Sequence, residues 1–487
     1  MSALATPDGH DEANSHSDDT SMTLSPSAAM SCPPSEPVEE SETNLDEVAA
    51  PPPVYDPSER SIQHHAYLET QLSETNHSVP PSPEGVSKES EASTPDSTAA
   101  QKPAESHTKR RLVKFSRITC ILSYLIISSI FGTLLRMVIE CLTFYPGTPV
   151  NTSVLWANVG GSLIMGFLSE DQEIFCHEEV KVWAVEPERW DNARRTAHVK
   201  AHKKTVPLYI GLTTGFCGSL TSFSTFIRDV FFALANMLPM PFGPYADVSL
   251  FASAPRDAMA PNGGFSFMSI IAVLFSEVCL SLAGLFLGAH LAIAVSPWTP
   301  SLPLAWLRNV LDPIIVVLAW LSWAAMICLV ILLPQNSRLS TIWSAELWRG
   351  PVLYALIFAP VGCLARFFIS LKLNGRVPWF PMGTFTVNIG GTMVLGMAYT
   401  LQHASIGTSS LGGGSYIDCQ VLQGIMDGFC GSLTTVSTWI LELSDLRRRH
   451  AYLYGGVSVV VAFCALVVEI GSLKWTQGLV TPLCFVE

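Results

Sequence analysis

Apolar residues are gathered into long runs over the last three quarters of the chain, whereas polar residues dominate the first 110 positions. A helix needs about 20 mainly apolar residues to cross the hydrocarbon core of a bilayer. The runs therefore predict nine crossings and an all-α polytopic membrane protein. The predicted spans lie near residues 118 to 139, 151 to 169, 207 to 237, 265 to 294, 311 to 333, 351 to 371, 381 to 402, 418 to 444 and 451 to 473.

The first 110 residues are rich in Ser, Pro, Glu, Thr and Ala and hold almost no aromatic residues. Such a segment cannot bury enough apolar surface to offset its ordering entropy, so residues 1 to 110 are predicted to be a disordered tail. No basic region followed by an apolar core opens the chain, and the first span is expected to act as its own signal anchor. The net charge of -13 argues against nucleic-acid binding.

Basic residues predict the sidedness of the spans. Five Lys or Arg residues between 109 and 117 precede the first span, whereas the loop 140 to 150 has none. Cytosolic loops carry an excess of Lys and Arg, so the amino terminus is predicted to be cytosolic and, after nine crossings, the carboxyl terminus extracellular. Further basic residues fall on the same predicted side: Arg194, Arg195, Lys200, Lys203, Lys204, Lys372, Arg376, Arg447, Arg448 and Arg449.

The two halves of the apolar region repeat one another. Gly132-Thr-Leu-Leu-Arg136 is matched by Gly362-Cys-Leu-Ala-Arg366, and Trp156-Ala-Asn-Val-Gly-Gly161 by Thr386-Val-Asn-Ile-Gly-Gly391, all 230 positions apart. Gly166 and Gly396 keep that spacing. The longest identity is Gly-Phe-Cys-Gly-Ser-Leu-Thr at 215 to 221 and again at 428 to 434, 213 positions apart. Seven consecutive identities at matched places indicate an internal duplication.

Each copy holds four predicted spans, and one further span lies between the copies. A unit with an even number of spans followed by a single crossing must return inverted, which predicts an antiparallel pair of repeats with an ion pathway at their interface. The predicted parts are a tail (1 to 110), a first four-span repeat (111 to 296), a linker with one transmembrane helix (297 to 350) and a second, inverted repeat (351 to 487).

The third and eighth spans each carry a Gly-x-x-Gly-x-x-Thr pattern that favours a break in the helix. Broken backbone at membrane depth is tolerated where protein or an ion satisfies its carbonyls, so two facing breaks could hold one cation. The alternative is that the glycines only allow close helix packing. The residues concerned are Gly218, Thr221, Gly431 and Thr434.

Polar and aromatic residues in the spans are the candidate pore lining. Asn158 and Asn388 place amide donors in apolar helices, although each could instead bond a neighbouring helix. Phe223 and Phe226 share one helix face, and phenyl edges carry partial positive charge, although paired aromatics are usually core. The second copy has Val436 and Trp439 at those places, so the two pathways are predicted to differ. The candidate hydroxyls are Ser224, Thr225, Ser437, Thr438, Tyr454 and Ser458.

Four charged side chains fall inside the predicted spans. Arg136 and Arg366 are expected to have a structural role, paired or reaching toward the interface. Glu277 and Glu469 could be a proton relay, partners of those arginines or interface residues. The sequon at Asn151 starts a span and is expected to remain unmodified. Twelve cysteines lack the paired spacing of a zinc site; those in apolar runs are expected to be small buried hydrophobes, with no disulfide framework, namely Cys120, Cys217, Cys279, Cys363, Cys430 and Cys464.

These motifs together resemble the Fluc/CrcB fluoride channels, and the fused double form is similar to the eukaryotic exporter branch, FEX. The resemblance covers about 118 to 294 and 351 to 473. It implies a fluoride-selective channel that acts as a single chain in the plasma membrane, exports fluoride passively and gives fluoride resistance. It also implies a structural sodium ion held by backbone carbonyls of Gly218, Thr221, Gly431 and Thr434, and no organic cofactor.

The resemblance assigns pore donors to Asn158 and Asn388 and anion-contacting phenyls to Phe223 and Phe226. Fluoride is small and strongly hydrated, so a selective path must be narrow and replace water with weak donors. Two other hypotheses stay open at this point. One is a proton-coupled anion transporter using Glu277 or Glu469. The other is a membrane enzyme or receptor, against which no constellation of metal-binding or nucleophilic residues is found, so the chain is not expected to be an enzyme.

Overall fold

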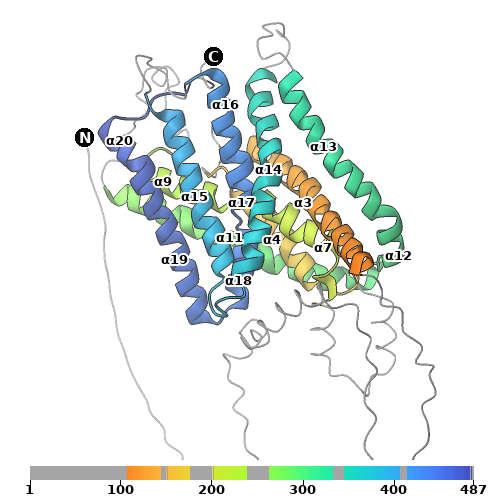
Figure 1. Cartoon of the computed structure of the whole chain (residues 1–487). Coiled ribbons are helices and arrows are strands. Elements are labelled where there is room, and N and C mark those ends of the chain that lie inside the picture. Colours follow the sequence, from red (N-terminus) through yellow and green to blue (C-terminus); the bar gives the residue numbers. More distant parts are fainter. Residues whose placement is uncertain are drawn as a thin grey trace, which may run out of the picture. The chain divides into compact units, whose positions relative to one another are not determined.

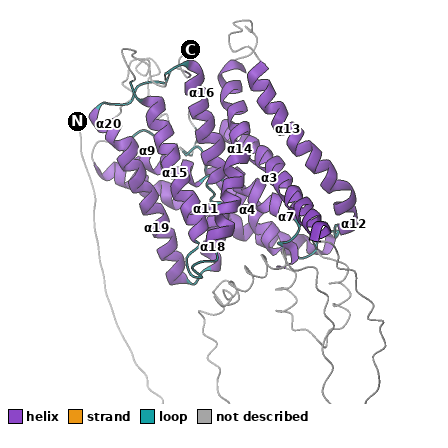
Figure 2. Cartoon of the chain, in the orientation of Figure 1, coloured by secondary structure: helices purple, strands orange, loops and turns teal. Residues whose placement is uncertain are grey.

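The computed structural model describes residues 107–143, 148, 150, 152–175, 200, 202–238, 263–332, 345–405, 414–482 and 484. Every regular element in these residues is a helix (Figures 1 and 2). The predicted tail up to residue 106, the sequon at Asn151 and the basic pair Arg194 and Arg195 lie outside the described residues. Those predictions therefore stay predictions.

The helices of the first half are α3 (His107–Thr143), α4 (Leu155–Glu170), α7 (Pro207–Ile210), the π-helix η2 (Gly211–Cys217), α8 (Gly218–Leu220), α9 (Phe223–Leu234) and α11 (Gly263–Val295). The connecting helices are η3 (Ser296–Trp298), α12 (Leu304–Trp306), η4 (Leu307–Leu311) and α13 (Asp312–Leu332). The second half has α14 (Ala345–Leu373), α15 (Met382–His403), α16 (Tyr416–Gly424), η5 (Ile425–Cys430), α17 (Gly431–Leu433), α18 (Ser437–Asp445), α19 (Arg448–Leu466), η6 (Val467–Gly471) and α20 (Ser472–Thr476).

Within the described part of the chain, five helical stretches are long and apolar enough to cross a membrane. They are Phe115–Thr143, Gly263–Trp298, Leu307–Leu332, Pro351–Leu373 and Arg448–Thr476, and they coincide with the first, fourth, fifth, sixth and ninth predicted spans. The second predicted span is carried by α4, which has only 16 residues. The third and eighth are divided into short helices. The structure thus establishes an all-helical membrane protein.

Each half packs a long helix against its own interrupted segment. In the first half α3 lies against η2 and α8, and in the second α14 lies against η5 and α17. A Cβ at Gly132 of α3 would lie only 2.6 Å from the carbonyl oxygen of Phe216, and one at Gly362 of α14 would overlap that of Phe429. Only glycine allows these two contacts, which explains why the matched Gly-x-x-x-Arg motifs open with it.

Helices of the two halves also pack against each other. Helix α9 of the first half lies against α15 and α19 of the second, and α18 of the second lies against α4 and α11 of the first. We call these two groups of helices the α9 interface and the α18 interface. Each interface combines the segment that follows a break in one half with two unbroken helices of the other half.

The linking helix α13 packs on α3 and α14 and leaves most of its apolar surface exposed. Its indole Trp323 Nε1 donates to the carbonyl of Ile357 at 3.0 Å, and Trp320 Nε1 donates to Ser123 Oγ at 3.1 Å. At its start Asp312 Oδ1 accepts from the hydroxyl of Tyr124 at 2.9 Å. A helix that is apolar all round and exposed on most sides is suited to contact lipid.

The cysteine prediction needs one correction. Cys419, at the start of α16, forms a disulfide with Cys484, 65 residues later. The backbone N–H of Val480 also donates to the carbonyl of His403 at 3.0 Å, so the carboxyl-terminal segment is held against the ends of α15 and α16. Of the cysteines expected to be buried, Cys279 and Cys464 are exposed on helix surfaces, where they are suited to face lipid, and the other four are buried.

We predict that the disulfide protects its two thiols from labelling by a polyethylene-glycol maleimide in intact cells, and that a membrane-impermeant reductant added outside exposes both. The predicted topology places this bond on the extracellular side, where disulfides persist. Serine at both positions should remove the reductant-dependent gel shift and lower stability by about 2 to 4 kcal/mol. The assay uses a Cys141→Ser chain because Cys141 is an exposed free thiol, and labelling of that chain without any reductant would contradict the prediction.

Candidate functional site

Both interrupted helices break at a threonine. Thr221 follows α8 with φ −94° and ψ 148°, and Thr434 follows α17 with φ −88° and ψ 157°. These are extended conformations directly after helical residues, so the chain changes direction before α9 and α18 begin. Each break is preceded by a π-helix, a form in which extra residues per turn often mark a functional site.

The threonine of each break caps the helix that follows the other break. Thr434 Oγ1 accepts from the N–H of Ser224 at 3.1 Å at the start of α9. Thr221 Oγ1 accepts from the N–H groups of Val436 and Ser437, both at 3.2 Å, at the start of α18. A helix start has unpaired N–H groups that a side-chain oxygen can satisfy. The two breaks therefore stabilise each other, and neither half can form this junction alone.

The two asparagines hold the breaks open. Asn158 Oδ1 accepts from the N–H of Ser222 at 2.9 Å, and Asn388 Oδ1 accepts from the N–H of Thr435 at 2.9 Å. These N–H groups would otherwise close helical bonds on the carbonyls of Gly218 and Gly431. The amide groups are also engaged, because Asn158 Nδ2 donates to Glu277 at 3.0 Å and Asn388 Nδ2 to the Thr435 carbonyl at 3.2 Å. Both side chains thus bond other segments of the chain, and their assignment to a pore stays a prediction.

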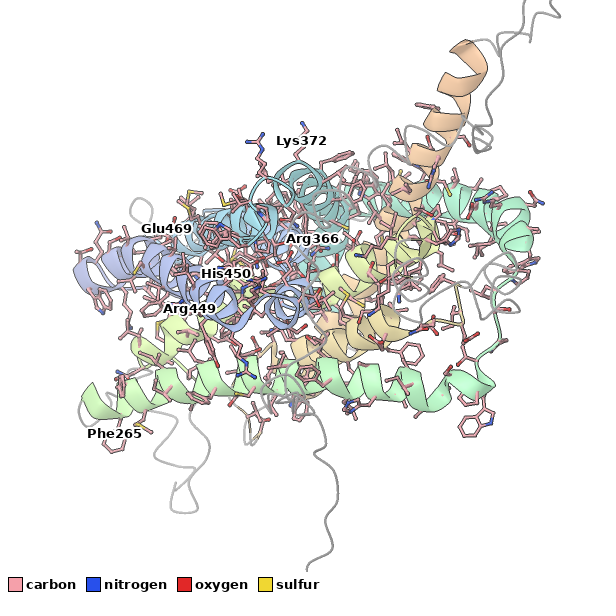
Figure 3. All side chains as sticks on the ribbon, turned by 90° about the horizontal axis from the view of Figure 1, so that it is seen from below. Phe265, Arg366, Lys372, Arg449, His450 and Glu469 are labelled. Atoms are coloured by element: carbon pink, nitrogen blue, oxygen red, sulfur yellow. A yellow bond between two sulfur atoms is a disulfide. The ribbon has the colours of Figure 1, made fainter. Side chains whose placement is uncertain are left out.

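Arg366 joins the two halves at the junction. Its guanidinium donates to the carbonyls of Gly218 at 2.6 Å, Thr434 at 3.2 Å and Thr214 at 2.5 Å. It is 3% exposed, and Figure 3 shows it among the helices while Lys372, farther along α14, points outward. Arg136, its counterpart on α3, donates to the carbonyl of Asp427 and lies 4.0 Å from Glu140. Carbonyl acceptors thus satisfy part of these buried charges, while Arg136 Nη1 and Arg366 Nε have no hydrogen-bond partner in the described part of the chain.

The residues expected to hold sodium meet at this junction. Neutral oxygens that have lost their helical partners are suited to a small hard cation. A Cβ at Gly218 or Gly431 would overlap the guanidinium of Arg366 or Arg136, so any larger residue there would displace an arginine from its present place. Arg366 already donates to the carbonyls of Gly218 and Thr434, but a carbonyl has two lone pairs, and each keeps one for a second donor or cation. Neutral carbonyl oxygens suit sodium, but a bound ion would share two of them with the positively charged guanidinium of Arg366.

The predicted phenyl pair is buried next to the junction. The rings of Phe223 and Phe226 meet edge to face, with centroids 5.7 Å apart and planes at 84°. Trp439 of α18 packs on the other side of Phe223, with centroids 5.2 Å apart. All three side chains are at most 2% exposed. In an edge-to-face pair the hydrogens of one ring point toward the face of the other.

The candidate hydroxyls fall into two groups. Two hydroxyls at the junction form hydrogen bonds with the break of the other half. Ser224 Oγ lies 3.1 Å from Thr434 Oγ1, and Ser437 Oγ lies 3.1 Å from Thr221 Oγ1. Thr225 and Thr438 receive caps on their N–H groups from Ser222 and Thr435. On α19, Ser458 Oγ donates to the carbonyl of Tyr454 at 2.7 Å. A hydroxyl bonded in this way keeps a lone pair but offers its proton to the backbone.

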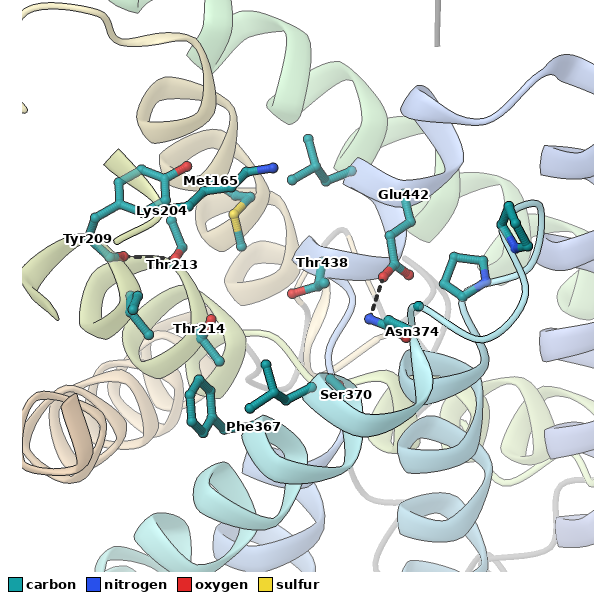
Figure 4. Close-up of a pocket in the computed structure, with 16 residues that line it drawn as sticks. Met165, Lys204, Tyr209, Thr213, Thr214, Phe367, Ser370, Asn374, Thr438 and Glu442 are labelled. Carbon is teal, nitrogen blue, oxygen red and sulfur yellow. Dashed lines mark hydrogen bonds between the residues drawn. The ribbon is translucent and has the colours of Figure 1, made fainter. Parts of the chain in front are cut away.

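A cavity of about 370 Å³ opens between the two halves on the predicted cytosolic side (Figure 4). Its wall is built by the ends of α4 and α14, by α7 with η2 and by α18, and it includes Lys204, Thr213, Thr214, Ser370, Asn374, Thr438 and Glu442. Glu442 accepts from Tyr454 OH at 2.8 Å, from Thr384 Oγ1 at 2.7 Å and from Asn374 Nδ2 at 3.4 Å. Tyr454 is therefore linked to this cavity by one hydrogen bond.

Two residues of this region were missed by sequence reasoning. In the sequence Glu442 looks like an ordinary surface charge near the end of a span. Lys203 was used only to predict which side of the membrane its loop faces. Lys203 Nζ donates to the carbonyls of Leu168, Ser169 and Asp171 at the end of α4, and burial lowers the pKa of this ammonium to about 8. The available signal was the doubled lysine at 203 and 204, three residues before Pro207, which starts a helix.

Together these features define an all-helical membrane protein with two matching helix breaks locked at one junction. No group of three or more His, Cys, Asp or Glu side chains that could hold a metal occurs among the residues described above. A family model described as "CrcB-like protein, Camphor Resistance (CrcB)" matches residues 123–256 and 353–470. The chain belongs to the CrcB-like family.

Three relatives illustrate the similarity. "Fluoride export protein 1" of Neurospora crassa is 46% identical over 371 residues, which cover 73% of this chain and 67% of that protein. "Fluoride export protein 1" of Candida albicans is 32% identical over 72% of this chain and 79% of that protein. "Fluoride-specific ion channel FluC" of Chromobacterium violaceum is 32% identical over 27% of this chain and 92% of that protein. No solved structure matches the chain.

Proposed function

We propose that this chain is a fluoride channel that exports fluoride passively from the cytoplasm through the plasma membrane and so gives fluoride resistance. The observation that carries the proposal is the junction at which Thr221 and Thr434 cap each other's helices beside the phenyl pair. Relatives of similar sequence are named fluoride export proteins and fluoride-specific ion channels, which supports the same activity here. Transport of an ion needs no chemical step, so we do not propose an enzyme.

The architecture we propose has nine spans in two inverted four-helix repeats joined by α13. Two observations support this arrangement: the breaks match, and α9 packs against helices of the second half while α18 packs against helices of the first. The amino terminus would be cytosolic and the carboxyl terminus extracellular, in agreement with the predicted charge asymmetry and with the disulfide at Cys484. Because one chain supplies both halves of the junction, we propose that it works as a monomer.

The conducting route we propose runs along the α9 interface. Fluoride enters the cavity that Lys204 and Glu442 line, passes Tyr454 and Ser458 on α19, and crosses the phenyl edges of Phe223 and Phe226. The acid at the entrance has its charge compensated by three donors, including the hydroxyl of Tyr454. In this route the hydroxyls of Tyr454 and Ser458 turn from Glu442 and the Tyr454 carbonyl, to which they donate, toward the anion. Together with the ring edges they replace water without a full positive charge that would trap the anion.

A negative membrane potential drives the anion outward at about 2.3 kcal/mol per 100 mV, so no coupled energy source is required. The junction keeps the route narrow because Arg366 and the two threonines hold both breaks in place. A sodium ion bound by the carbonyls of Gly218, Thr221, Gly431 and Thr434 would add a structural charge there. We propose it as a resident ion that is not transported.

The test is fluoride efflux from liposomes that contain the purified chain, with the voltage clamped by a potassium gradient and valinomycin. We expect voltage-driven efflux that is selective for fluoride over chloride and independent of any proton gradient. Liposomes without protein are the control. Efflux that requires a proton gradient would instead support the proton-coupled transporter, the second candidate that the buried acid Glu277 favours. No efflux from well-folded protein would contradict both.

A further inference from the structure

We propose that a cluster of exposed arginines, with one tryptophan beside it, binds the phosphate of an anionic phospholipid in the cytosolic leaflet. The cluster, which we call the basic surface, consists of Arg376, Trp379, Arg447, Arg448 and Arg449. The inference rests on the topology proposed above, which places this end of the second half in the cytosol. It does not depend on which ion is transported.

Two segments of the second half meet at the basic surface. The ring of Trp379, in the loop between α14 and α15, lies against the ring of His450 near the start of α19, with centroids 5.5 Å apart. The next residue, Phe380, packs edge to face on Tyr454, one turn farther along α19, with centroids 5.1 Å apart. These contacts hold the loop that carries Arg376 against the start of α19.

Positive charge predominates on this surface. Its four arginines are exposed, and Figure 3, which views the molecule from below, shows Arg449 beside His450. Residues 372 to 381 contain no acid, and Asp445 is the single acid between residues 445 and 450. In the part of the chain that the structure describes, three of the four arginines form no ion pair, namely Arg376, Arg447 and Arg449. Their charge is therefore available to an anion from outside the chain.

The place of three of these arginines on their helix also favours an anion. Arg447 is the N-cap of α19, and Arg448 and Arg449 are its first two residues. A helix amino terminus carries partial positive charge, so cations there are disfavoured, and adjacent arginines repel one another as well. A phosphate group next to the three guanidinium groups relieves both kinds of repulsion.

The basic surface lies where the apolar surface of α19 begins. The helical stretch Arg448–Thr476 is long and apolar enough to cross a membrane, and its outward residues are exposed from Tyr452 onward. Trp379 is also exposed, and Trp and Tyr are enriched at the level of lipid headgroups. Arginines one turn before this apolar surface therefore reach the headgroup phosphates, which a guanidinium can bind through two parallel hydrogen bonds.

The charge of the surface selects an anionic lipid over a zwitterionic one. Four to eight Lys or Arg residues directly cytoplasmic of a transmembrane helix are typical of binding to phosphatidylserine and phosphoinositides, and the basic surface has four. In phosphatidylcholine the choline cation cancels the phosphate charge, so the arginines gain little from it. A lipid with net negative charge is the ligand that this surface fits.

The experiment measures the thermal unfolding of the purified full chain in neutral detergent with added short-chain phosphatidylserine. We expect this lipid to raise the apparent Tm by at least about 3 °C, and short-chain phosphatidylcholine by less than about 1 °C. Salt at about 0.5 M should remove most of the shift, because the contacts are exposed and electrostatic. Inorganic phosphate and a polyglutamate peptide are tested at the same concentration.

The variants separate charge from fold. The triple change Arg447→Gln, Arg448→Gln and Arg449→Gln should raise the phosphatidylserine concentration for a half-maximal shift at least about tenfold. Lysine at the same three positions should keep that concentration within about threefold of the native value, since the charge remains. Lys474→Gln, which removes a charge on the predicted extracellular side, should leave it unchanged within about twofold.

Several results would overturn the inference. One is an equal shift with phosphatidylcholine, and another is a triple glutamine variant that binds phosphatidylserine as the native chain does. A shift with inorganic phosphate or polyglutamate as large as that with the lipid would assign the surface to a soluble phosphate or an acidic protein segment instead. If the triple variant does not fold, Arg449→Gln decides the question, with an expected increase of about fivefold in the half-maximal concentration. A chain that binds the lipid but passes no fluoride would refute only the proposed function.

Discussion

A Phe223→Ile channel is expected to fold as the native chain does and to pass at least about ten times less fluoride. Isoleucine keeps most of the buried volume but has no ring edge. Phe223 makes edge-to-face contacts with both Phe226 and Trp439, so the substitution removes the positive ring hydrogens at the centre of the proposed route. The measurement is voltage-clamped fluoride efflux from liposomes, with protein amount matched by gel filtration.

The matched control is Val436→Ile, at the corresponding position after the second break. Val436 is also buried, at 2% exposed, and its replacement by isoleucine adds one carbon and changes no aromatic ring. Its efflux should stay within about twofold of the native value. Equal losses in both variants would mean that the phenyl pair serves packing alone, and the proposed route along α9 would then be wrong.

An Arg366→Met chain is expected to lose about 3 to 5 kcal/mol of stability, which corresponds to a fall of about 10 °C in the apparent Tm. Methionine has a similar length but cannot donate, so the carbonyls of Gly218, Thr214 and Thr434 lose a donor at the point where the two halves meet. Thermal unfolding in detergent, followed by intrinsic fluorescence, measures the loss.

Lys372→Met is the control on the same helix. Lys372 is exposed and points away from the neighbouring helices (Figure 3), so its replacement should change the Tm by no more than about 1 to 2 °C. An Arg366→Met chain that unfolds at the native temperature would show that the carbonyl contacts contribute little. The junction would then depend on the threonine caps.

The asparagines illustrate where sequence reasoning stopped. An amide in an apolar helix has to find a partner, and the sequence left open whether that partner is an anion or a neighbouring helix. The structure shows Asn158 and Asn388 bonding the first N–H groups beyond the breaks, a pairing between residues that lie 64 and 47 positions apart. No local pattern encodes such a distance.

The disulfide was missed for a related reason. Cys419 lies in the middle of the second half and Cys484 near its end, in a chain whose other cysteines are mostly scattered through apolar runs. Spacing alone predicts a framework only when cysteines are dense in a small domain. Here the bond depends on the return of the carboxyl-terminal segment to α16, which the contact between Val480 and His403 also records.

The sequence by itself determined that the protein is helical and membrane-embedded, that its halves are related, and that the third and eighth spans break at Gly-x-x-Gly-x-x-Thr. These features are local: hydropathy, the length of apolar runs and the conformational freedom of glycine act over a few turns of helix. Only the tertiary structure decided that Thr221 and Thr434 cap each other's helices, that Arg366 bonds carbonyls of both halves, and that Glu277 stands beside Asn158. Those pairings depend on which helix faces meet, and a periodic apolar pattern leaves many such arrangements open.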